Sequence, residues 1–138
     1  MMTHKEGFSG QAAALAAGAG FLLVASLPAL AGDVGQEVSI AAQHAGFAAD
    51  AVIITTVHAH LHHTINCLVG PNGEGFDAKE LNPCQGKGNG ALPDTTDASK
   101  KLMLQEALTK AQAGLASDDL ATAKLDATAA QAVLKKAM

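Results

Sequence analysis

The chain has few aromatic residues and no arginine. Among its 138 residues tryptophan and tyrosine are absent, and of the four phenylalanines only Phe47 and Phe76 lie beyond the first thirty or so positions. That leaves too few aromatic rings to build the platforms on which bases or sugars stack. All nine basic residues are lysines, and the formal net charge is −4, which is unsuited to a phosphate backbone. These absences argue against nucleic acid and carbohydrate as partners.

Motifs of the common catalytic sites are also missing. No serine lies in a GxSxG elbow, and neither HExxH nor the haem-attachment motif CxxCH occurs. The glycine-rich segment 86–90 (GKGNG) lacks the spacing and the following Ser or Thr of a phosphate-binding loop. We therefore expect a protein that is not an enzyme.

Residues 1–31 have the pattern of a cleaved export signal. Lys5 supplies a positive charge, residues 12–26 are apolar, and Ala29 and Ala31 are small residues at the two positions that a signal peptidase reads. Cleavage is expected before Gly32, which leaves a single helical domain, residues 32–138, in the periplasm or secreted.

The alternative for this segment is an uncleaved membrane anchor. Its apolar run is shorter than the ~20 residues that a span needs and is interrupted by Gly18, Gly20 and Pro28. No second hydrophobic stretch follows, so we expect no membrane span after cleavage.

The only two cysteines, Cys67 and Cys84, are expected to pair, because an exported chain meets an oxidising compartment. The disulfide would close residues 68–83, which are rich in Gly, Pro and Asn, and in the chain-entropy model such a loop contributes roughly 3 kcal/mol. The alternative makes both thiolates metal ligands together with His63, four residues before Cys67.

Hydrophobic spacing predicts an all-α fold, a small up-down bundle of three to four helices with a disulfide-tied Gly/Pro-rich loop. Residues 37–68 lack proline and have apolar positions at helical spacing, with a possible break at Gly46 and residues 33–45 as a possible fourth helix. Residues 69–94 are expected to form a loop between this histidine-bearing segment and a C-terminal helical hairpin over 95–138. Ser117 is the expected N-cap of the last helix.

Histidine is the residue type that points to a function. Five of the six histidines fall within twenty positions: His44, His58, His60, His62 and His63. Neutral imidazole binds zinc, copper and nickel, and histidines three or four apart on a helix share a face. This density predicts metal binding.

Helical geometry divides these histidines. His58 and His62 lie beside the apolar stripe and are the expected principal ligands, while His60 and His63, on the opposite side, are expected to form a secondary pair. His44 lies ~27 Å away along a straight helix. It can join a site only if the chain bends, and Gly46 is the favoured position.

Two other hypotheses stay open. Haem could be held non-covalently by His58 or His62 with Met103 or another histidine opposite, although the lack of aromatic residues makes a poor haem pocket. In the other hypothesis, an extracytoplasmic interaction module, the tied loop presents Phe76 and Leu81 to a protein partner. The oligomeric state is left open.

The chain resembles small periplasmic metal-binding proteins of bacteria. The resemblance covers the leader, the alanine-rich composition, the cluster at residues 58–63 and the hairpin segment from 107–114 (ALTKAQAG) onward. Those proteins are short four-helix bundles that sequester copper, nickel or zinc, and the resemblance implies the same here. They scatter histidines along all helices, whereas this hairpin has none, and the resemblance does not account for the Cys67–Cys84 loop. One or two sites are therefore expected rather than high-capacity storage.

Overall fold

A computed structural model of the chain describes residues 32–138, and the predicted leader, 1–31, lies outside the described residues. This part of the chain is helical and contains no strand. Its elements are α1 (Val34–Asp50), α2 (Ile54–Val69), α3 (Ala91–Asp94), α4 (Ala98–Leu115) and α5 (Leu120–Ala137). The prediction of an all-α fold with a Cys67–Cys84 disulfide is confirmed.

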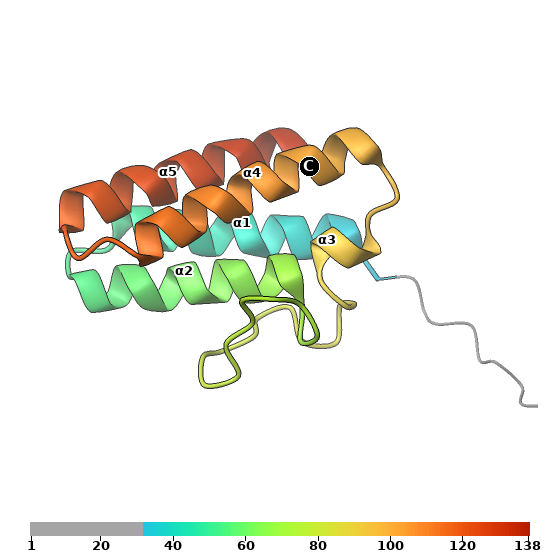
Figure 1. The fold of residues 1–138 in the computed structure, drawn as a ribbon, viewed down its shortest axis with the longest axis horizontal. Coiled ribbons are helices and arrows are strands. Elements are labelled where there is room, and N and C mark those ends of the chain that lie inside the picture. The colour runs from blue at the N-terminus through green and yellow to red at the C-terminus, as the bar shows by residue number, and fades with distance from the viewer. Residues whose placement is uncertain (1–31) are drawn as a thin grey trace, which may run out of the picture.

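The four long helices form two antiparallel hairpins that pack on one another (Figure 1). Helix α1 contacts both α2 and α5, and α4 contacts α5 and α2, which gives an up-down bundle. The single turn α3 and the loop 70–90 lie at the end of the bundle where α2 ends and α1 begins (Figure 1). Between residues 32 and 138 no helix is long and apolar enough to cross a membrane.

Small side chains line the core. The fully buried alanines of the long helices are Ala41, Ala45, Ala48, Ala107, Ala111, Ala123, Ala127 and Ala130. At Gly114 a β-carbon would lie 2.9 Å from Cδ1 of Leu61 and 3.0 Å from the carbonyl oxygen of Ala123, so the helices approach closely there. Close approach through small residues buries little apolar area per residue, and the fold therefore needs additional links.

Aspartates cap three of the long helices. Asp33, Asp97 and Asp119 each accept a hydrogen bond from the backbone N–H three residues on, at the starts of α1, α4 and α5. The prediction of Ser117 as the cap of α5 is wrong, because that helix begins at Leu120. The Ser117 hydroxyl instead accepts a hydrogen bond from the Asp119 N–H, which stabilises the turn before the cap.

The predicted chain break at Gly46 is also wrong. Helix α1 runs through Gly46 and ends at Asp50, and the chain reverses over residues 51–53. Gly46 faces α5, where a β-carbon would overlap the side-chain amide of Gln131, so this glycine permits close packing instead of breaking the helix.

The predicted loop 69–94 is shorter than expected. Helix α2 continues through Val69, and residues 91–94 form α3, which leaves 70–90 as the loop. At its two ends the backbones of Gly70 (φ +69°) and Gly90 (φ +111°) meet so closely that a β-carbon on Gly90 would lie 2.5 Å from the Gly70 nitrogen.

Asn66 fastens this loop to α2, beside the disulfide. Its buried side-chain amide donates hydrogen bonds to the carbonyl oxygens of Asp77 (3.0 Å) and Leu81 (3.2 Å) and accepts one from the Asp77 N–H (2.9 Å). The adjacent Cys67 is bonded to Cys84. Two neighbouring residues of α2 thus hold both halves of the loop.

We expect Asn66→Ala to lower the free energy of unfolding by about 2–3 kcal/mol, because it leaves buried backbone groups of the loop without partners. Urea denaturation measures the change. Asn72→Ala is the matched control, because Asn72 is exposed and its side chain makes no hydrogen bond in residues 32–138; it should stay within about 0.5 kcal/mol of the parent protein. Equal effects of the two substitutions would contradict this role of Asn66.

Candidate metal centre

Three histidines from two helices meet on one side of the bundle. His44 comes from α1, and His60 and His63 come from α2. Nδ1 of His44 lies 3.2 Å from Nδ1 of His60 and 3.3 Å from Nδ1 of His63. One ligand atom from each histidine lies within 4.8 Å of the other two, so this cluster could hold a metal ion.

The antiparallel packing of α1 on α2 creates the cluster. His60 and His63 are three residues apart and share a face of α2. On the same face, the buried hydroxyl of Thr64 lies 3.0 Å from the carbonyl oxygen of His60 and 3.4 Å from that of Ala41 in α1. This contact orients that face of α2 toward α1. His44 lies on α1, three residues after Ala41.

The spacing of the donors fits a tetrahedral ion. Zinc–nitrogen bonds of about 2.05 Å at tetrahedral angles put neighbouring nitrogens about 3.3 Å apart. The two Nδ1–Nδ1 distances from His44, 3.2 and 3.3 Å, match that value. Three protein nitrogens in this arrangement leave a fourth coordination position for water or an exchanging donor.

Hydrogen bonding alone satisfies this cluster poorly. An Nδ1 atom either carries one proton to donate or offers one lone pair. Nδ1 of His44 faces two other Nδ1 atoms and can make one good hydrogen bond with only one of them. A metal ion would use all three lone pairs at once, with the protons on the Nε2 atoms.

Burial disfavours the charged forms of His44 and His63. The pKa of His44 is lowered to about 4, chiefly because burial disfavours the imidazolium and also because His63 and His60 are close by. The pKa of His63 is lowered chiefly by burial and also by His60 and His62, with Glu80 opposing the shift. Neutral imidazoles at neutral pH are the form that binds metals.

Two neighbouring side chains complete the surroundings. The ring of Phe47 lies edge-on to His44, with ring centroids 5.5 Å apart, and 5.3 Å from the ring of His60. Although Phe47 is 45% exposed, it covers two of the three ligands with an apolar ring. Oε2 of Glu80 lies 3.7 Å from Nε2 of His63, the nitrogen that faces away from the cluster. A carboxylate there favours the proton on Nε2 and leaves Nδ1 free to bind a metal.

The predicted principal pair lies outside this cluster. Nε2 of His58 is 2.9 Å from the carbonyl oxygen of Ser117, so it contacts the turn between α4 and α5. His62 points toward the loop, with Nδ1 buried and 3.7 Å from Oδ2 of Asp77. The predicted secondary pair, His60 and His63, instead joins His44. The ligand role of each histidine stays a prediction.

Cysteine takes no part in the centre. The alternative in which the thiolates of Cys67 and Cys84 bind a metal with His63 is wrong, because the two sulfur atoms are bonded to each other. The donor set offered by this cluster is therefore all-nitrogen.

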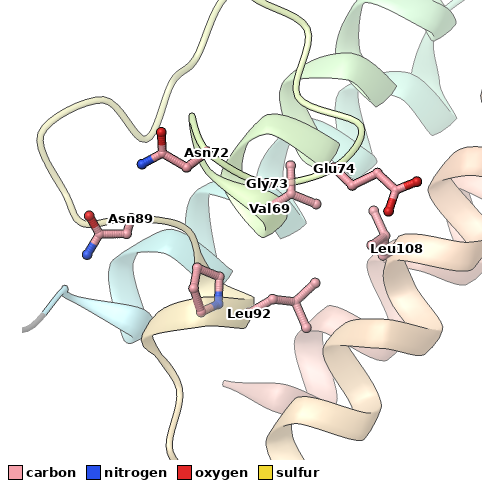
Figure 2. A pocket seen from close by; sticks show the side chains of 8 residues that line it. Val69, Asn72, Gly73, Glu74, Asn89, Leu92 and Leu108 are labelled. Atoms are coloured by element: carbon pink, nitrogen blue, oxygen red, sulfur yellow. The ribbon is translucent and has the colours of Figure 1, made fainter.

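Three surface hollows contain no histidine in their walls, and two of them involve the loop. A cavity of about 440 Å³ lies between the loop, α3 and α4 (Figure 2). Its walls are mainly apolar, and its lining residues are Val69, Asn72, Gly73, Glu74, Asn89, Leu92, Pro93 and Leu108. Phe76 and the 60% exposed Leu81, the residues of the interaction hypothesis, line a separate hollow.

No protein-family model, curated protein sequence or solved structure matches this chain.

The metal-free protein should lose stability as the pH falls from about 6.5 to about 4. His44 accepts a proton near pH 6.5 in the unfolded chain but only near 4 when folded, so the unfolded state binds more protons across this window. The expected loss is roughly 2 kcal/mol, after discounting for partial solvent exposure. Urea denaturation in the presence of EDTA measures it. His44→Gln should flatten the profile, and an unchanged slope in that variant would contradict the assignment.

Glu80→Gln should weaken metal binding roughly tenfold, because carboxylates that orient a ligand histidine typically contribute 10–100-fold and this one is partly exposed. Competition with a chromophoric chelator measures the affinity. Glu74→Gln is the control, because Glu74 lies in the same loop without an ion pair to any histidine in residues 32–138. A loss of the same size in both variants would show a general charge effect instead.

Proposed function

We propose that this protein is an exported, non-enzymatic metal-binding protein that holds one transition-metal ion per chain through His44, His60 and His63. The observation that carries the proposal is the convergence of three histidines, in which Nδ1 of His44 lies 3.2 and 3.3 Å from Nδ1 of His60 and His63, the spacing of ligands around a tetrahedral ion. Residues far apart in the sequence supply these atoms.

The donor chemistry favours copper, zinc or nickel. Neutral imidazoles suit all three metals, whereas calcium and magnesium require oxygen ligands. A single site with a free fourth position suits sequestration and transfer, because an incoming donor could bind the ion before the histidines release it. The resemblance to periplasmic metal-binding bundles is consistent with this proposal.

Two further observations support binding outside the cytoplasm without catalysis. The intramolecular disulfide fits an oxidising compartment, as the predicted leader does. A hydrolytic metal site also needs a general base beside the metal-bound water. Glu80 contacts the outward nitrogen of His63, so this carboxylate is placed to orient a ligand, not to act as that base.

Metal binding to histidine variants tests the proposal. The parent protein, exported and purified without an affinity tag or chelating resin, should bind one equivalent of copper, zinc or nickel, measured by elemental analysis after dialysis. His44→Ala, His60→Ala and His63→Ala should each weaken binding at least a hundredfold, because two imidazoles hold an ion far less well than three.

His58→Ala is the control, because it removes a histidine from the same helix without touching the cluster. It should keep full stoichiometry, even if losing the contact with Ser117 lowers stability. Loss of binding in His58→Ala with retention in His44→Ala would contradict the proposed ligands. A parent protein that takes up no stoichiometric metal would overturn the function and favour the interaction module.

A further inference from the structure

A buried carboxylate without a cation lies near the start of α1, seven residues before His44. Glu37 is 0% exposed; its Oε1 accepts a hydrogen bond from the Gly90 N–H (2.9 Å), and its Oε2 has no hydrogen-bond partner. Burying an ionised carboxylate without a partner is costly. A side chain kept in this position therefore points to a missing positive charge.

Gly88 lies against this carboxylate, and Gly32 lies against Gly88 and Asp94. A β-carbon on Gly88 would lie 2.8 Å from Oε1 of Glu37 and 2.7 Å from the α-carbon of Gly32, and it would overlap Oδ2 of Asp94. A β-carbon on Gly32 would overlap the same oxygen of Asp94. The Asp33 N–H donates to the Lys87 carbonyl oxygen (2.8 Å) and holds the segment there. The backbone of Gly32 thus lies against the Asp94 carboxylate, and Gly88 adjoins both Gly32 and the carboxylate of Glu37.

The charges around Glu37 are negative. Burial raises its pKa most, the Gly90 N–H opposes the shift, and the carboxylates of Asp94 and Asp33 raise it further. Lys87 is next to Gly88 in the sequence, but no lysine forms an ion pair with Glu37, Asp33 or Asp94 in residues 32–138. A cation beside Glu37 would compensate this negative charge, and the side chains of residues 32–138 do not provide one.

We propose that this cation is the α-ammonium group of Gly32, formed when the leader is removed. Hydrolysis of the Ala31–Gly32 peptide bond adds one water: the hydroxyl completes the carboxylic acid of Ala31, and the Gly32 nitrogen becomes an amine that is protonated at neutral pH. That charge forms next to Glu37 and Asp94. In the precursor the same nitrogen is a neutral amide, so processing stabilises the folded domain. This inference does not depend on the metal centre.

The pKa of the new amino group tests the proposal in the unmodified protein. The full chain is exported, its mature mass is measured, and the Gly32 α-carbon signal is titrated by NMR. We expect a chain that begins at Gly32 and an α-amino pKa about one unit above the ordinary value of roughly 8. Glu37→Gln should remove most of that shift, and Glu106→Gln, at an exposed position on α4, should leave it unchanged.

Three outcomes would overturn the proposal. The first is a mature chain that begins elsewhere. The second is an amino pKa near 8 that Glu37→Gln does not change. The third is an ordinary pKa together with a rise in Tm on adding calcium or magnesium, which would make the cation a solution ion. As a second measurement, N-acetylation of Gly32 should lower the Tm at pH 7 by several degrees, and an unchanged Tm would contradict the proposal.

Discussion

The antiparallel packing of α1 on α2 is the contact on which the rest of the structure depends. Fully buried Ala41 and Ala45 make it close, and the Thr64 hydroxyl lies against the α1 backbone across it. The same packing brings His44 to within hydrogen-bonding distance of two α2 histidines that are 16 and 19 residues away in the sequence. A metal bound there would in turn join the two helices, because its ligands come from both of them.

The second constraint is the small core. Helices that pack through alanine bury little apolar area. The loop 70–90 has few apolar residues of its own, so polar and covalent links attach it to the helices. The Cys67–Cys84 disulfide, the amide of Asn66 and the carboxylate of Glu37 each join this loop or its end to a helix. Since Glu80 also belongs to the loop and contacts His63, order in the loop is coupled to the metal centre.

The sequence was sufficient for much of the fold and for only part of the site. Helical spacing, the glycines of the loop and the two cysteines predicted the helices, the long loop and the disulfide, because each depends on local patterns. The histidine density pointed to α2, but azimuth on one helix favoured His58 and His62, whereas the cluster in the structure joins His60 and His63 to His44. The candidate site depends on a contact between two helices, because His44 reaches α2 only when the chain reverses at residues 51–53. No glycine or proline marks that reversal in the sequence, so the bend was predicted at Gly46 instead.

The most direct test of the central claim is a long-range ¹H–¹⁵N correlation spectrum of the zinc-loaded protein, which reports for each histidine the ring nitrogen that binds the metal. The account predicts Nδ1 coordination by His44, His60 and His63, with the proton on Nε2, while His58 and His62 keep the signals of uncoordinated rings. Coordination by His58 and His62, or through the Nε2 atoms of the cluster, would contradict the centre described above.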